Sequence, residues 1–325
     1  MSVATQIEIL DLRHFSARQL RPLLEDEAGV WKRRLRWNYE SSSELLLQYL
    51  DSRILPGFVA LDRGRVCGFT FCVYEGHKAV IGDAYAISNE PGQGLLIVER
   101  LVGQLLDLLL NSPDVERIES QLLLYDTGVI DNRFREAGFQ LYPRLFMEYD
   151  KQSVSPAYSG EALPEWLKLS SWTAACYQPA AELIHEAYAG HIDASINDQY
   201  RSLHGSLRFL HNIVRFPGCG TFEAAASWVL RDTRTGALAG MLLCSRVAPD
   251  VAHITQICVA APYRRHGLGR ALMEQFIGHM ADGGFTAITL TVTESNREAV
   301  HLYESLGFNV RHRFNAMVKD KRFDD

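Results

Sequence analysis

Apolar runs long enough to cross a membrane are missing from this 325-residue sequence, since none approaches the roughly 18 residues that such a helix needs. The first stretch, MSVATQIEILDL, also lacks the basic start and apolar core of a signal peptide. Six cysteines are present, but none forms a CxxC pair or a spacing typical of a metal site. We therefore expect no membrane partner, no metal and a reducing, cytoplasmic location.

An excess of positive charge is also missing, because 33 lysines and arginines stand against 39 aspartates and glutamates, for a net charge of −6. Such a chain has no general attraction for nucleic acid, and we expect none as a partner. The basic run Lys32-Arg33-Arg34 with Arg36 is interleaved with tryptophan and leucine, which favours the solvated face of a helix over a phosphate patch. With 47% hydrophobic residues, the composition is that of an ordinary globular protein.

The chain is long enough for two domains, and its composition changes near residues 151–164. This stretch is rich in Ser, Pro and Gly and has no periodicity, so we predict a linker there, between domains at 1–150 and 165–325. Each half runs in the same order: two strands around a tight turn, a strand, a helix, a strand and a short helix ended by glycine. REAGF (135–139) and ESLGF (304–308) fall at matching places, which indicates a diverged internal duplication of an α/β fold with a mixed sheet.

The most informative stretch is VAAPYRRHGLGRA (259–271), in which a strand ends, an R-x-x-G-x-G loop follows and a helix begins. The first amides of a helix have no partners and attract phosphate groups. Gly267 and Gly269 let the backbone approach such a group closely, and Arg264, Arg265 and Arg270 add positive charge. A third glycine and a following GK[ST] are absent, which excludes a Rossmann fingerprint and a Walker loop. The loop alone is equally compatible with a plain helix start.

About thirty residues later comes NREAVHLYESLGF (296–308). With V-x-x-P, R-x-x-G-x-G and N-x-x-A-x-x-x-Y-x-x-x-G-F in this order, the sequence resembles the GNAT superfamily of N-acetyltransferases over roughly residues 165–319. The resemblance implies an acyl-CoA-dependent N-acyltransferase with acetyl-CoA as co-substrate and a small-molecule or peptide amine as acceptor. The first half resembles the same fold without the motif, and this tandem layout is similar to that of mycothiol synthases.

The resemblance also implies roles for individual residues. Tyr303 would protonate the leaving thiolate, and Asn296 would contact the cofactor arm. The base that deprotonates the amine stays open between His253, Glu294 and water. The backbone would hold acetyl-CoA at two places, the pantetheine arm at Ile257, Cys258 and Val259, and the pyrophosphate at Arg265, His266, Gly267, Leu268, Gly269 and Arg270.

The first half departs from this pattern. Aligned on the Gly-Phe pair, Tyr303 corresponds to Phe134, which has no proton to give. The loop SNEPGQGLL keeps Gly92 and Gly94 but has no arginine, so we expect a structural domain, with a residual diphosphate site as the alternative. Two other functions stay open: acetylation of an amino-thiol conjugate, as in mycothiol synthases, and a non-catalytic acyl-CoA-binding regulatory module.

Overall fold

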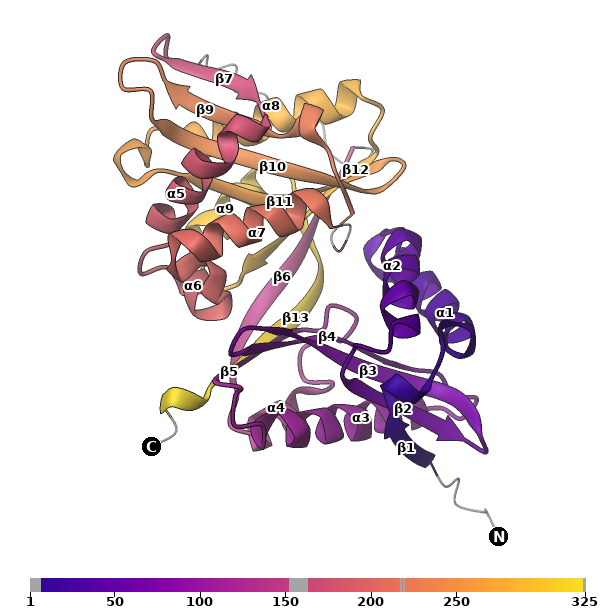
Figure 1. Cartoon of the computed structure of the whole chain (residues 1–325). Coiled ribbons are helices and arrows are strands. Elements are labelled where there is room, and N and C mark those ends of the chain that lie inside the picture. The colour runs from indigo at the N-terminus through magenta and orange to yellow at the C-terminus, as the bar shows by residue number, and fades with distance from the viewer. Residues whose placement is uncertain (1–6, 152–162, 217, 219, 324–325) are drawn as a thin grey trace. The chain divides into compact units, whose positions relative to one another are not determined.

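The computed structural model describes residues 7–151, 163–216, 218 and 220–323 (Figure 1). They form two compact units. Unit 1 consists of the residues up to Arg34, Tyr39–Pro143 and the residues from Arg313 on, and unit 2 of Leu35–Asn38 and Arg144–His312. Most of the expected linker at 151–164 lies outside the described residues.

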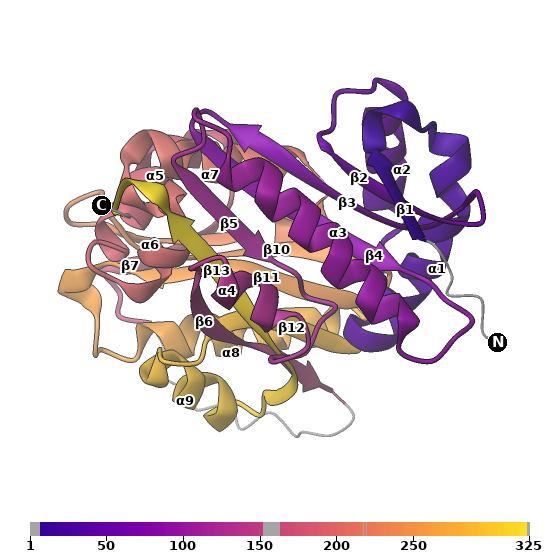
Figure 2. The ribbon, with the colours of Figure 1, turned by 90° about the horizontal axis from the view of Figure 1, so that it is seen from below.

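Unit 1 is built on antiparallel pairing of successive strands β1 to β4, followed by a parallel pairing of β4 with β5. Helix α3 packs on this sheet through an apolar stripe that includes Val98, Val102 and Leu105, and Figure 2 looks onto the face that carries it. The elements before the closing strand are β1 (Ile7–Asp11), α1 (Ala17–Leu35), α2 (Glu40–Asp51), β2 (Gly57–Asp62), β3 (Arg65–Glu75), β4 (Lys78–Ala86), α3 (Gln93–Leu110), β5 (Arg117–Gln121) and α4 (Asp131–Glu136).

Unit 2 pairs β7, β9, β10 and β11 antiparallel, and β11 then pairs with β12 in parallel. Helices α5 and α7 cover one face of the sheet, and α8 and α9 cover the other (Figure 1). The elements between the linker and the closing strand are β7 (Leu167–Ser171), α5 (Tyr177–Ala187), α6 (Ile192–Ile196), α7 (Leu203–Arg215), β8 (Thr221–Phe222), β9 (Trp228–Asp232), β10 (Leu238–Ala248), β11 (Val251–Val259), α8 (Leu268–Asp282), β12 (Ala287–Thr293) and α9 (Arg297–Ser305). The sequence-based expectation of an α/β fold with a mixed sheet is confirmed.

Two long strands are exchanged between the halves of the sequence. β6 (Gln140–Asp150) ends the first half but pairs antiparallel with β12, and β13 (Asn309–Asp320) ends the second half but pairs antiparallel with β5. Sequence order assigns each closing strand to its own half, and the structure differs at both. In a duplicated fold the two strands have similar patterns and can occupy equivalent places.

The basic run before α2 is also not a plain solvated face. Arg36 has φ 59° and its guanidinium lies 3.1 Å from the Glu148 carboxylate and 3.1 Å from the Thr286 hydroxyl. Beside it, Trp37 packs against Phe146 with ring centroids 6.0 Å apart. Residues 35–38 therefore belong to the packing of unit 2, which the amphipathic pattern did not predict.

The described cysteines are free and buried, at positions 67, 72, 176, 244 and 258, and Cys219 lies outside the described residues. Over the same described ranges, the helices are too short or too polar to span a bilayer.

Two carboxylic acids are buried together in unit 1. Glu27 of α1 is 0% exposed and Asp83 of β4 is 4% exposed. Asp83 accepts hydrogen bonds from the Ala84 amide at 2.8 Å and from the Tyr39 hydroxyl at 3.3 Å, whereas Glu27 accepts one from the Trp31 indole at 3.2 Å. Burial raises the pKa of both carboxyls, and the charge of Asp83 raises the pKa of Glu27 further. Glu27 is therefore the member of the pair that retains its proton.

The buried pair of Glu27 and Asp83 predicts that the free energy of unfolding falls as the pH rises. Since the folded pKa of Glu27 lies above its unfolded value of about 4.3, stability is lost as the pH rises from that value through the folded one. Glutamine cannot ionise, so Glu27→Gln should raise the free energy of unfolding by about 1 kcal/mol near neutral pH, and by less in acid. Urea denaturation across pH measures this, with exposed Glu25→Gln as the control. A Glu27→Gln difference that does not change with pH would contradict it.

Candidate functional site

Strands β11 and β12 pair along only half of their length. Their parallel pairing covers Val251–Ile254 and Ala287–Leu290, and no further pair joins them among the described residues, although both strands continue. The parting begins at a β-bulge, because Leu243 and Cys244 of β10 face Gln256 and Ile254 and leave Thr255 without a partner position. A bulge bends its strand, so the end of β11 turns away from β12.

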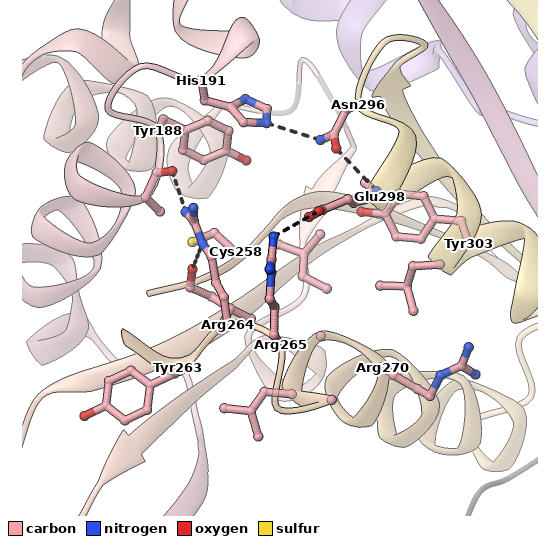
Figure 3. A pocket seen from close by; sticks show the side chains of 18 residues that line it. Tyr188, His191, Cys258, Tyr263, Arg264, Arg265, Arg270, Asn296, Glu298 and Tyr303 are labelled. Atoms are coloured by element: carbon pink, nitrogen blue, oxygen red, sulfur yellow. Dashed lines mark hydrogen bonds and ion pairs between the residues drawn. The ribbon is translucent and has the colours of Figure 1, made fainter. Parts of the chain in front are cut away.

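A cavity of about 610 Å³ lies where the two strands part. Its walls come from the end of β11, the loop before α8, the start of α9 and the segment after α5 (Figure 3). The residues that line it are Ala187, Tyr188, His191, Ile257, Cys258, Val259, Tyr263, Arg264, Arg265, Gly267, Leu268, Gly269, Arg270, Asn296, Glu298, Ala299, Leu302 and Tyr303. The structure thus brings most of the sequence-predicted site residues to one cavity.

The loop before α8 presents a row of unpaired backbone donors. Arg265 and Gly267 both have left-handed backbones, with φ 63° and φ 73°, and Gly267 caps α8 without a side-chain hydrogen bond. Within the described part of the chain, no acceptor receives a hydrogen bond from the amides of residues 265–270. Successive amides around left-handed residues, at a helix start, form a concave site for an anion.

Gly269 is not required by the packing of the protein itself. A Cβ at this position would have its nearest neighbour in the Leu302 side chain, at an ordinary contact distance of 3.5 Å. Both residues line the cavity. The space beside Gly269 is therefore available to a bound molecule that approaches the backbone closely.

The arginines mostly brace the loop. Arg264 donates to the Val259 carbonyl at 3.1 Å and to the Ala187 carbonyl at 2.7 Å, which ties the loop to β11 and α5 (Figure 3). Arg270 donates to the Ser305 hydroxyl at 2.5 Å, which ties α8 to the end of α9. The Arg265 side chain is 89% exposed and is the one of the three guanidinium groups with freedom to move at the rim.

His266 is exposed, and its Nδ1 lies 2.8 Å from the Arg264 carbonyl. Its side chain does not line the cavity. Only its amide contributes to the row of backbone donors.

Tyr303 of α9 is 6% exposed and lines the cavity. Among the described residues, no hydrogen bond contributes to the pKa of its hydroxyl. Burial raises the pKa of Tyr303 above its ordinary value, and the negative charge of Asp193 adds to this effect. The phenol therefore carries a proton at neutral pH that it can donate to a molecule in the cavity.

Asn296 connects two walls of the cavity. Its Oδ1 caps α9 by accepting from the Ala299 amide at 3.3 Å, and its Nδ2 lies 3.3 Å from Nε2 of His191 (Figure 3). The cap fixes the orientation of the amide, so the Nδ2 group faces the segment after α5.

His253 and Glu294, the two candidate bases, are not among the residues that line the cavity. The His253 ring is 5% exposed and packs against Trp37 and Phe146, with centroids 4.8 and 6.1 Å away, while its Nδ1 lies 2.9 Å from the Thr289 hydroxyl. Burial lowers the pKa of His253 to about 3, and the charge of Arg144 contributes. His253 is thus placed as a neutral core residue.

His191 and Glu298 line the cavity but were not identified from the sequence. Glu298 lies in the first turn of α9, and its carboxylate is 3.9 Å from the Arg265 guanidinium. His191 lies between α5 and α6, about a hundred residues before the motif. No local spacing marks this segment, so only the fold shows that it reaches the site.

Unit 1 contains a counterpart of this site with different side chains. β4 pairs with β5 only along Lys78–Ile81, its pairing with β3 has a bulge at Gly82 directly after that stretch, and Gly92 caps α3 with φ 79°. The cavity there is about 1110 Å³. Its charged lining residues are Asp26, Asp62, Arg63, Arg65 and Glu90. The backbone features of the duplication are kept, but the charged side chains around the equivalent helix start are of both signs, three acidic and two basic.

Across the described ranges, no group of three or more His, Cys, Asp or Glu side chains is placed to hold a metal ion.

Known proteins resemble the second half of the chain in sequence. The acetyltransferase (GNAT) family model matches residues 155–308, just under half of the chain. The [ribosomal protein bS18]-alanine N-acetyltransferase of Escherichia coli K12 is 42% identical over 77 residues, which are 24% of this chain and 51% of that protein. Mycothiol acetyltransferase of Thermomonospora curvata is 38% identical over 76 residues, 23% of this chain and 25% of that one. The chain thus spans about half the length, or less, of these relatives.

Solved structures resemble the whole chain in fold. A GCN5-related N-acetyltransferase from Sphaerobacter thermophilus has a TM-score of 0.63 at 15% identity, covering 97% of this chain and 96% of that one. A tandem GNAT protein from the clavulanic acid biosynthesis pathway has a TM-score of 0.62 at 16% identity, covering 97% and 99%. The tandem arrangement of two such folds, expected from the internal repeat, is confirmed.

The placement of His253 predicts an effect of acid on stability. Its folded pKa of about 3 lies below the unfolded value of about 6.5, so stability is complete above 6.5 and is lost as the pH falls. In that window His253 should contribute up to about 1.4 kcal/mol per pH unit to the slope. His253→Gln should remove this contribution in denaturant titrations, whereas exposed His301→Gln should not. The same slope for His253→Gln and the original protein would show that the ring is not a neutral core residue.

Proposed function

Since the acetyltransferase (GNAT) family model matches residues 155–308, we propose that this chain transfers an acetyl group from acetyl-CoA to a primary amine, and that unit 2 carries the activity. The observation that carries the proposal is the row of partnerless amides at residues 265–270 on the cavity wall. An amide row of this kind at a helix start suits a diphosphate, and the family match supplies the identity of the molecule that bears it.

The residues of the cavity fit acetyl-CoA in three respects. The amides of residues 265–270 would hold the pyrophosphate, with Gly269 leaving room for close approach. The backbone of Ile257, Cys258 and Val259, left open where β11 parts from β12, would hold the pantetheine arm. Asn296 has its Oδ1 engaged by the cap of α9, so its Nδ2 is the group that would face the cofactor arm.

The bound acetyl-CoA supplies an activated thioester, and the protein would supply the proton for its leaving sulfur. Tyr303 is suited to this task because its buried hydroxyl is protonated and lines the cavity, and no hydrogen bond among the described residues contributes to its pKa. A well-placed general acid contributes about 10²–10⁴ in rate. A chain that only bound acyl-CoA would have no use for such a group, which is why we favour catalysis over a regulatory module.

For the acceptor we propose a chemical class and not a particular molecule. The names of the two relatives refer to an alanine of ribosomal protein bS18 and to mycothiol, so one name points to a protein and the other to a small molecule. Both relatives match only part of their length, and neither carries its acceptor over to this chain. We propose a primary amine of a small molecule or peptide, with an amino-thiol conjugate as the second candidate. The free, buried thiols are compatible with a cytoplasmic location for this activity.

Acetyl-CoA binding tests the phosphate site. In isothermal titration we expect one acetyl-CoA per chain, because the glycine loop of unit 1 has no arginine and the carboxylates of its cavity outnumber the guanidinium groups by three to two. Gly269→Ala should weaken binding about tenfold or more, since its new Cβ occupies the approach to the amides. Gly278→Ala, on the same helix with open space around it, should leave the affinity unchanged. An absence of binding to the original protein would refute the proposed function.

The rate of acetyl transfer tests the proposed role of Tyr303 as a general acid. Tyr303→Phe removes only the hydroxyl, so kcat should fall about 10²- to 10⁴-fold while the dissociation constant for acetyl-CoA stays the same. Thiol release with a panel of primary amines measures this. Tyr149→Phe is the matched control, because Tyr149 belongs to the same buried cluster but does not line the cavity. Equal turnover by Tyr303→Phe and the original protein would remove the acid role.

A further inference from the structure

Asp193 does not itself line this cavity, but it contacts the lining residue His191, and its carboxylate has no strong cationic partner among the described residues. The Asp193 side chain is 15% exposed, and one of its oxygens accepts a hydrogen bond from the Thr293 hydroxyl. The other oxygen lies 3.7 Å from Nδ1 of His191, and no lysine or arginine forms an ion pair with it in the described part of the chain. A half-buried carboxylate of this kind gains most from a cation that comes from outside the protein.

Asp193 is attached to the point where β11 and β12 part. Thr293, which holds its carboxylate, is the last residue of β12. The His191 ring, which accepts from the Asp193 amide at 3.1 Å, lines the cavity and lies 3.3 Å from Asn296. These contacts hold the start of α6 against the end of β12. Figure 3 shows the contact of His191 with Asn296 and, on the helix that Asn296 caps, Tyr303.

The charge of Asp193 acts on the tyrosines around it. It raises the pKa of Tyr303, after the larger effect of burial, and it also contributes to the raised pKa values of Tyr188 and Tyr200. Tyr188 and Tyr303 both line the cavity, so the carboxylate lies within electrostatic reach of two of its walls.

Aromatic rings complete the surroundings. Tyr188 stacks on Tyr200 with centroids 4.4 Å apart, and the His191 ring meets Tyr188 edge-on at 5.3 Å. Aromatic faces attract a cation, so these rings add to the attraction of the Asp193 carboxylate, whose charge reaches both Tyr188 and Tyr200.

We propose that Asp193 binds the ammonium group of the acceptor and so selects positively charged primary amines, with Thr293 as the positioning residue that holds its carboxylate and His191 as the one that holds its backbone amide. The inference rests on the proposed function and adds a binding site for the acceptor. The bound ammonium group must pass one proton to water before its nitrogen can attack the thioester, because only the free amine has a lone pair.

The first experiment measures acceptor binding without turnover. The complex of the protein with CoA, which carries no acetyl group, is titrated with L-alaninamide and with its neutral isostere lactamide. We expect L-alaninamide to bind at least tenfold more tightly than lactamide. Asp193→Asn, which keeps the acceptor oxygen for the Thr293 hydroxyl, should weaken L-alaninamide about 10- to 100-fold and leave lactamide unchanged. No preference for the charged probe, or equal binding by Asp193→Asn, would overturn the proposal.

Two controls separate this inference from its premise. CoA affinity and the melting temperature are measured for every variant, since Asp193→Asn should change neither and Glu186→Gln, an exposed carboxylate at the end of α5, should change nothing. If CoA itself does not bind, the proposed function fails. If CoA binds and Asp193→Asn has no effect, only the acceptor site fails.

The positioning role proposed for Thr293 is tested independently, through KM and kcat. Thr293→Val removes the hydrogen bond to the Asp193 carboxylate but keeps the charge. In turnover of L-alaninamide, we expect it to raise KM several-fold with little change in kcat, and Asp193→Asn to raise KM more. A fall in kcat at unchanged KM for both variants would show that the pair serves the chemical step and not acceptor binding.

Discussion

The parting of β11 from β12 is the constraint on which the rest of the site depends. Paired parallel strands satisfy each other's backbone groups, and here the pairing stops at Ile254 and Leu290, next to the bulge at Thr255. The open edge of β11 must find partners outside the sheet. The parting of the two strands also separates the loop before α8 from the end of β12 and leaves the cavity between them. The one extra residue in β11 thus opens a cavity beside the strand, and no particular side chain is needed to form it.

Comparison of the two units shows which part of the site belongs to the backbone and which to the side chains. Both units have the bulge, the short parallel pairing and a left-handed glycine before the long helix, at Gly92 and Gly267. Only unit 2 has the arginine-rich loop and the hydroxyl of Tyr303, whereas unit 1 has the buried ring of Phe134 and a cavity with charged side chains of both signs. The backbone features are therefore kept in both units, whereas the side chains around them differ.

The sequence identifies those parts of the site that are contiguous in the chain. Gly267, Gly269 and Asn296 fall in one motif whose spacing reflects a helix start and a helix cap, so their meeting at one cavity could be predicted. Asp193 could not, because it reaches the end of β12 only through the fold. The strand exchange of β6 and β13 escapes prediction for a related reason: the pattern of a strand records its buried face, but not which equivalent neighbour it joins.

The proposed acceptor site links the raised pKa of Tyr303 to the binding of the acceptor. Burial is the larger cause of that pKa, and it acts whether or not an acceptor is bound. The charge of Asp193 is the smaller cause, and an ammonium group beside Asp193 would offset it. The arriving acceptor would then make the Tyr303 proton easier to donate, while the empty site would hold that proton more firmly. Proton donation would thus be favoured when the amine is in place, which protects the thioester from unproductive loss of its acyl group.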